Sequence, residues 1–292
     1  MKRLLPLLLC LPLLAEAQTL ERIRSSQQLN IGYQANLAPF SSTLDGQPRG
    51  YAIELCQQVV EQIRQQPGFE RLQQSFRALD TQEGLEAVRD GSLDLFCGAT
   101  SETLERRGQV SFSVPIYAAG RGVVVRRDAP QSLVQALNGG GQQAAPQWRA
   151  NIARVLGNHR FLVLKGSTTE IWARERVREL GLAASIRAVD NLREGMELLD
   201  RGQADAFFSD RVLMHNWLAS SGMDGRLQVL DRLFDLEPMG LVLARGDEDF
   251  RLLVDTTLSR LYRSGRIESI YGRYFGPPSE PVKLLFRAYA PR

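Results

Sequence analysis

The sequence predicts an α/β protein with two similar lobes. Strand-like and helix-like segments alternate from the start, with a strand at 29–33, an amphipathic helix at 51–65, a strand near Phe76 and a helix at 82–90. This order is typical of a lobe with a largely parallel sheet. A repeat with a constant offset of 111 residues supports a second lobe, because Gly84, Glu86, Gly91, Asp94 and Phe96 recur as Gly195, Glu197, Gly202, Asp205 and Phe207. A helix, a glycine stop and a buried strand in matching order favour two related lobes over a chance likeness between common helix–strand units.

The chain is expected to cross between the lobes twice. Arg121 interrupts an apolar strand pattern at 118–125, and a second crossing is expected at 238–241. We therefore assign residues 18–121 and 240–292 to the first lobe and residues 122–239 to the second. The last part, 250–275, reads as two helices separated by Ser264 and Gly265.

Residues 128–160 form a polar, glycine-rich insert in the second lobe. A helix is predicted at its end, over 149–156, and the rest suits an exposed excursion from the lobe. A partner contact and a flexible lid are both open as its role.

The first 17 residues have the pattern of a secretory signal peptide. Lys2 and Arg3 precede a short apolar run, and Ala15-Glu16-Ala17 is a small-x-small cleavage site. Without these residues the chain carries 34 Lys and Arg against 32 Asp and Glu, with no block of like charge. This balance gives no support for nucleic-acid binding. The signal peptide predicts an exported protein, and since no second long apolar run follows it, we expect the mature protein to be soluble.

Two cysteines remain after this segment, Cys56 early in a predicted helix and Cys97 at a strand end. An even pair in an exported protein suggests a disulfide, and in a lobe of this kind the two positions are neighbours. Two buried free thiols are the alternative. With no CxxC motif and only His159 and His215 as histidines, we expect no metal site and no cofactor.

Residues 96–106 have the composition of half an anion site. The small residues after Phe96, including Ala99, allow a ligand close to the backbone. The hydroxyls of Thr100 and Ser101 can donate hydrogen bonds, and Arg106 can hold a carboxylate with two of them. The alternative is an ordinary strand end followed by a helix cap.

The segments Cys-Gly-Ala-Thr-Ser-Glu-Thr-Leu-Glu-Arg-Arg, from Cys97, and Val-Ser-Phe-Ser-Val-Pro-Ile-Tyr-Ala-Ala-Gly, from Val110, carry a family resemblance. They resemble the amino-acid-binding proteins of bacterial ABC importers, solute-binding protein family 3, and the Cys-Gly-x-Thr form is most similar to the glutamate/aspartate branch. The resemblance implies a type II periplasmic binding protein fold, with a ligand cleft between two lobes joined by a two-strand hinge. It also implies a periplasmic monomer that delivers a free amino acid to an inner-membrane ABC permease, and similar cysteine pairs in relatives add support for the disulfide.

The second half of the site follows two strands of the second lobe. Residues 165–170 contain a capping box, Ser167 to Glu170, and a helix start with free N–H groups is also an anion site. In the family this turn, here including Thr168 and Thr169, lies against the ligand's α-carboxylate. Asp210 ends the repeated strand, where the family has an aspartate for the α-amino group; the alternative is an N-cap for the helix at 211–218.

Specificity is expected from five further residues, and the resemblance guides how each is weighed. Arg121 could neutralise a side-chain carboxylate, whereas Gln34 departs from the basic residue expected in glutamate binders. Leu37 replaces a stacking aromatic, which argues against flat cationic ligands. Together with Phe40 and Asn191, these residues favour an acidic or polar amino acid.

The leading hypothesis is therefore a non-catalytic binding protein that closes by hinge motion. The alternative is a periplasmic cyclohexadienyl (prephenate/arogenate) dehydratase-like enzyme on the same fold, for which Glu170 is the nearest proton donor. A ligand sensor for a separate receptor is the third possibility.

Overall fold

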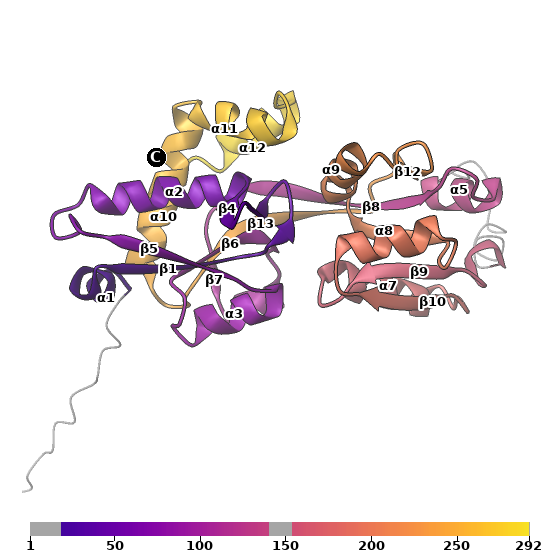
Figure 1. Cartoon of the computed structure of the whole chain (residues 1–292), viewed down its shortest axis with the longest axis horizontal. Helices are drawn as coiled ribbons and strands as arrows, with labels where there is room; N and C mark the ends of the chain where they lie inside the picture. The colour runs from indigo at the N-terminus through magenta and orange to yellow at the C-terminus, as the bar shows by residue number, and fades with distance from the viewer. Residues whose placement is uncertain (1–18, 140–153, 292) are drawn as a thin grey trace, which may run out of the picture.

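The computed structural model describes residues 19–139 and 154–291. The predicted signal peptide and most of the helix predicted at 149–156 lie outside the described residues. The described chain forms two lobes joined side by side through one continuous mixed sheet, as the sequence predicts (Figure 1).

The first lobe is built on three parallel strands, with the first in the middle. These are β1 (Gln28–Tyr33), β5 (Gln73–Ala78) and β6 (Leu95–Ser101). Figure 1 shows α3 on one side of this sheet and the C-terminal helices on the other. The helices and smaller strands of this lobe are α1 (Thr19–Ser26), α2 (Tyr51–Arg64), α3 (Thr81–Arg89), α4 (Leu104–Arg107), α10 (Glu248–Arg263), α11 (Arg266–Phe275), α12 (Glu280–Ala288), β2 (Asn36–Leu37), β3 (Ser41–Leu44), β4 (Gln47–Arg49) and β7 (Ser111–Phe112).

The second lobe repeats the plan. Its three parallel strands are β9 (Arg160–Leu164), β10 (Ser185–Val189) and β11 (Ala206–Asp210), again with the first in the middle. The other elements are α5 (Gln131–Asn138), α7 (Thr168–Glu179), α8 (Leu192–Asp200), α9 (Arg211–Ser221) and β12 (Leu227–Val229). Helix α5 lies within the segment predicted as an exposed excursion, yet Leu133 and Leu137 are buried in the core of the lobe.

Two long antiparallel strands join the lobes, β8 (Tyr117–Arg126) and β13 (Asp235–Leu243). They pair with each other from Arg121 opposite Asp235 to Tyr117 opposite Met239. Beyond this ladder β8 pairs with β11, and β13 pairs with β6. The lobe boundaries predicted at residues 121 and 239 fall within these strands and stay predictions.

The structure gives the 111-residue repeat a packing reason. A Cβ atom on Gly84 would lie 2.5 Å from the Phe96 ring, and one on Gly195 would lie 2.5 Å from the Phe207 ring. Each helix therefore needs glycine to lie against the aromatic ring of the following strand, because a methyl group has no room there.

The repeated aspartates also have matching roles. The Asp94 carboxylate accepts a hydrogen bond from the backbone N–H of Asn30 in β1, at 2.7 Å. The Asp205 carboxylate accepts one from Arg160 in β9, also at 2.7 Å. Each aspartate thus joins its own strand to the central strand of its lobe.

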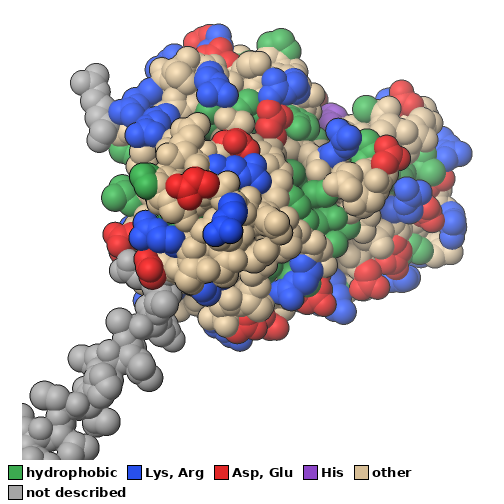
Figure 2. Space-filling view, turned by 60° about the vertical axis from the view of Figure 1, so that its left-hand side comes forward, with side chains coloured by type: hydrophobic (Ala, Val, Ile, Leu, Met, Phe, Trp, Pro, Cys, Tyr) green, Lys and Arg blue, Asp and Glu red, His purple; other side chains and the backbone are tan. Residues whose placement is uncertain are grey.

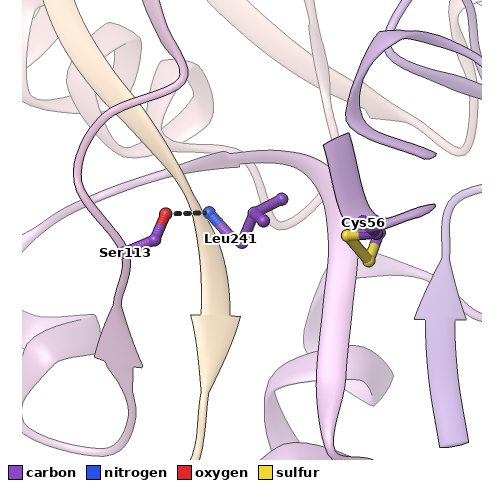
Figure 3. The surroundings of a disulfide bond; sticks show 4 residues. Cys56, Ser113 and Leu241 are labelled. Atoms are coloured by element: carbon purple, nitrogen blue, oxygen red, sulfur yellow. Dashed lines mark hydrogen bonds between the residues drawn. A yellow bond between two sulfur atoms is a disulfide. The ribbon is translucent and has the colours of Figure 1, made fainter. Parts of the chain in front are cut away.

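The predicted disulfide between Cys56 and Cys97 is confirmed. It links α2 to β6 over a Cα–Cα distance of 6.4 Å, and both cysteines are fully buried. Figure 3 shows this bond near Ser113, whose hydroxyl accepts a hydrogen bond from the backbone N–H of Leu241 at 3.0 Å. The disulfide thus fixes α2 against β6, which carries the first half of the site, and the Ser113 contact holds the segment after β7 beside β13.

On the surface, basic and acidic side chains are intermixed on the face shown in Figure 2. No helix within residues 19–139 and 154–291 has the length and apolar character needed to cross a membrane.

Candidate functional site

A cavity of about 730 Å³ lies between the lobes, with walls from both. In the first lobe its walls are the segments after β1, β5 and β6; in the second lobe they are the segments after β9 and β10 and the end of β11. Open α/β sheets bind ligands at the carboxyl ends of parallel strands. This cavity lies at the carboxyl ends of the parallel strands of both lobes.

The cavity brings together eight of the residues predicted from the sequence. They are Gln34, Leu37, Ser101, Arg106, Thr168, Thr169, Asn191 and Asp210. Both predicted halves of the site therefore face one space, although their sequence positions span more than half of the chain.

Arg106 bridges the two lobes. Thr103 caps the short helix α4, and this places the arginine directly after the turn that follows β6. Its guanidinium donates to the backbone carbonyl of Ser101 at 2.9 Å and to that of Gly166, in the second lobe, at 3.4 Å. Burial lowers the pKa of Arg106, and Glu237 acts in the opposite direction. The group remains a cation over the physiological pH range, since its ordinary pKa lies above 12.

The turn at the start of α7 faces Arg106 from the second lobe. Ser167 caps this helix by accepting from the backbone N–H of Glu170 at 3.1 Å, which is one half of the predicted capping box. The Glu170 carboxylate accepts from the backbone N–H of Gly166 at 2.9 Å instead of from that of Ser167. Thr168 and Thr169 occupy the first positions of the helix, where unpaired N–H groups and the helix dipole favour an anion.

The joining strands hold these two threonines in place. Glu237, in β13, accepts a hydrogen bond from the Thr168 hydroxyl at 2.7 Å and forms an ion pair with Arg121 of β8. Arg121 also contacts the Thr169 hydroxyl at 3.3 Å and forms an ion pair with Asp235 at 3.2 Å. Two neighbouring charges on the strands between the lobes thus fix the anion-facing turn.

Arg121 was predicted to face a ligand carboxylate, and the structure places it elsewhere. Its side chain is only 4% exposed, and it is stacked over the Trp172 ring at 4.9 Å. It lines a smaller neighbouring cavity of about 390 Å³, which shares Gln82, Arg106, Gly166 and Thr168 with the wall of the larger one. Its charge is used by Asp235 and Glu237, which makes it a positioning residue.

Asp210 faces the cavity from the end of β11. It is the N-cap residue of α9, but its side chain makes no capping hydrogen bond, so the predicted alternative role is not seen. Across the described residues, no hydrogen bond or ion pair to its carboxylate is found. Burial and, to a smaller extent, repulsion from Glu237 raise the pKa of Asp210 to about 7, although the Arg121 charge acts in the opposite direction. A partly buried carboxylate without a bonded partner gains most from an incoming cation.

Gln34 and Asn191 are both held by local contacts. The buried Gln34 side chain donates to the Thr81 hydroxyl at 2.7 Å, and it packs so closely on Gly98 that a Cβ there would lie 2.2 Å from its oxygen. Asn191 caps α8 by accepting from the backbone N–H of Glu194 at 3.0 Å. Both amides line the cavity from fixed positions.

Three remaining predicted residues do not join the site so clearly. Phe40 is fully buried among Tyr51, Tyr117 and Phe275, and it is not part of the cavity wall. The Thr100 hydroxyl is buried without a hydrogen-bond partner, and Thr100 is not part of the cavity wall, whereas Ser101 is. Ala99 belongs to β6, and its role stays a prediction.

The sequence reasoning missed several polar residues of this region. Asp80 and Glu83 form a reciprocal capping box at the start of α3, and Lys165 lies 3.9 Å from Asp190 at the opposite wall. The Asp80–Glu83 spacing is a recognisable helix-start signature that could have placed this turn at the cavity. Glu237 carries no such signal, because its role depends on the pairing of β8 with β13.

Comparison with known proteins decides the family. A sequence profile of the bacterial extracellular solute-binding proteins, family 3, matches residues 29–277. The chain belongs to this family. The solute-binding protein is 26% identical over 281 residues to the L-glutamate/L-aspartate-binding protein of Pseudomonas aeruginosa, covering 95% of this chain and 87% of that protein. It is 21% identical over 262 residues to the ABC transporter glutamine-binding protein of Bacillus subtilis, covering 89% and 85%.

Among solved structures, the solute-binding protein resembles the ancestral amino acid-binding protein AncCDT-1, a precursor of cyclohexadienyl dehydratase. The TM-score is 0.69 with 23% identity, covering 88% of this chain and 99% of that structure. This likeness confirms the two-lobed fold. In the described residues, no group of His, Cys, Asp or Glu has the arrangement needed to hold a metal ion.

Proposed function

We propose that this solute-binding protein captures a free α-amino acid in the periplasm and delivers it to an ABC transporter. The observation that carries the proposal is that Arg106 and Asp210 face one cavity from opposite lobes. A zwitterion has one group for each of them. Its carboxylate matches Arg106 with the Thr168–Thr169 turn, and its ammonium group matches the unpaired Asp210 carboxylate.

The structure also suggests how binding would close the cleft. The guanidinium of Arg106 already contacts Gly166 across the lobes, and an α-carboxylate between Arg106 and α7 would strengthen that bridge. Since β8 and β13 are long strands that join the lobes, a small rotation about them would bring the walls together. The names of the relatives, which include binders of glutamate, aspartate and glutamine, support an amino acid as the ligand.

The dehydratase alternative needs a carboxylic acid that can donate a proton near neutral pH. Glu170 does not suit this role. Although partial burial opposes it, hydrogen bonds from Arg174 and the Gly166 backbone lower the pKa of the Glu170 carboxyl. The side chain accepts these bonds at 2.7 to 3.0 Å, so the group is an ionised structural cap. Delivery to a receptor instead of a transporter would begin with the same binding step.

A thermal-shift screen with the twenty amino acids, followed by calorimetry, tests the proposal. We expect a reversible, saturable rise in melting temperature with at least one amino acid. Arg106→Ala should abolish the rise, whereas Arg107→Ala should retain it, because Arg107 is an exposed neighbour paired with Glu102. A full ligand response in Arg106→Ala, or turnover of prephenate by the wild-type protein, would overturn the proposal.

A further inference from the structure

We infer that the cavity selects against a second carboxylate, so that amino acids with a neutral polar side chain bind more tightly than their acidic counterparts of the same length. The inference rests on the proposed function and narrows it. It comes from the charges around the ligand and from which of them are already paired.

The described wall of the cavity is acidic overall. It contains four carboxylates, Asp80, Glu83, Asp190 and Asp210, and two cations, Arg106 and Lys165. A bound zwitterion takes up Arg106 and Asp210. Its side chain then faces three carboxylates and one ammonium group, an environment that repels a further negative charge.

Both nearby cations already have carboxylate neighbours. Lys165 is 75% exposed at its side chain and lies 3.9 Å from Asp190, which shares its charge. Arg121 lies behind the wall, in the neighbouring cavity, and is paired with both Asp235 and Glu237. An acidic side chain would therefore lose water without gaining a dedicated cation, and this is unfavourable.

Neutral polar ligands meet better-matched groups. The wall contains four amide side chains, Gln34, Asn36, Gln82 and Asn191. An amide offers both a carbonyl acceptor and N–H donors, so it can pair with a ligand amide or hydroxyl in either sense. Gln34 is the most firmly fixed of them, since it is 5% exposed and bound to Thr81.

Calorimetry with two matched pairs at pH 8 tests the inference. Glutamine should bind at least tenfold more tightly than glutamate, and asparagine at least tenfold more tightly than aspartate. If another neutral or basic amino acid is the ligand, the absence of a response to both acids supports the inference equally.

Two variants test the cause. Asp190→Asn releases Lys165 from its partner and removes one negative charge, so the preference against glutamate and aspartate should shrink about threefold or more. Because the Asp190 side chain is 79% exposed, we expect the variant to fold like the wild type. Asp231→Asn removes another highly exposed carboxylate, which is not part of the wall, and should leave the ratio unchanged.

The results separate this inference from the proposed function. Glutamate or aspartate binding as tightly as its amide, or more tightly, would overturn the inference and leave the proposed function standing. An unchanged ratio in Asp190→Asn would overturn the electrostatic cause. No response to any amino acid would overturn both.

Discussion

Replacing Asp210 by asparagine should change how both stability and ligand affinity depend on pH. The pKa of the folded protein's Asp210 is raised from 3.8 to about 7 by burial and by repulsion from Glu237. Between about pH 4 and pH 7 the folded state therefore binds one more proton at this residue than the unfolded chain. Below about pH 4 the raised pKa of Asp210 costs the folded protein almost no stability. The free energy of unfolding then falls as the pH rises from about 4 to about 7.

The size of the effect follows from the shift. A difference between 3.8 and about 7 corresponds to at most about 4 kcal/mol. Since Asp210 remains partly exposed, we expect about 2 kcal/mol. Asp210→Asn should therefore stabilise the ligand-free protein by about 2 kcal/mol at pH 8 and have almost no effect at pH 4.

Ligand affinity should respond in the opposite sense. An ammonium group requires the ionised carboxylate, so the affinity of the wild-type protein should fall about tenfold for each pH unit below 7. Between pH 8 and pH 5 this amounts to roughly 100-fold, while the charges of an amino acid's own α-groups barely change. In Asp210→Asn, binding should be weak and nearly independent of pH.

Denaturant unfolding at pH 4, 6 and 8, and calorimetric titration at pH 5 to 8, measure the two effects. Subtracting the variant from the wild type isolates Asp210 from His215, whose pKa burial lowers. Equal stabilities of the two proteins at pH 8, or a wild-type affinity that is constant from pH 8 to pH 5, would refute the role given to Asp210.

Three further substitutions test the parts that hold the site. Glu237→Gln should destabilise the protein by about 2 kcal/mol, because it leaves the buried Arg121 with Asp235, at 3.2 Å, as its carboxylate partner. It should also lower the pH midpoint of ligand affinity, because Glu237 raises the pKa of Asp210; an unchanged midpoint in calorimetry would contradict this effect. Thiol titration of the denatured, unreduced protein should find no free thiol at Cys56 or Cys97. Replacing both cysteines by serine should lower the free energy of unfolding by about 4 kcal/mol, because the disulfide closes a loop of 41 residues; guanidinium unfolding measures this loss. Gly195→Ala should destabilise the protein by about 1–3 kcal/mol, because the added methyl group overpacks against Phe207. The control Gly272→Ala, at an open helical position, should be neutral or stabilising by up to about 1 kcal/mol. Similar melting temperatures for the two variants would exclude the steric argument.

Local sequence signals predicted much of the fold. The alternation of strands and helices and the repeat of Gly84 and Phe96 at Gly195 and Phe207 report packing that recurs in each lobe. The helix cap at Ser167 and the cysteine pair are likewise visible in the sequence, because the cap depends on one helix start and the disulfide on two neighbouring elements.

The features that the sequence did not predict depend mainly on contacts between segments that are distant in the chain. Arg121 was predicted as a ligand group because it interrupts an apolar strand, but its partners Asp235 and Glu237 are brought to it only by the pairing of β8 with β13. Phe40 was a reasonable candidate for the same region, yet its burial depends on Phe275 at the other end of the chain. Helix α12 follows a proline-rich turn and carries no repeat partner, so it was not predicted.

The central claim is that opposite ends of a zwitterion are held by Arg106 and Asp210. The most direct measurement is calorimetry of the wild-type protein with three molecules: the amino acid that gives the largest thermal shift, the same molecule lacking its α-carboxylate, and the same molecule lacking its α-amino group. The account predicts saturable binding of the intact amino acid and at least 100-fold weaker binding of both analogues, about 3 kcal/mol for each lost ionic contact. Binding of either analogue within about tenfold of the intact amino acid would contradict it.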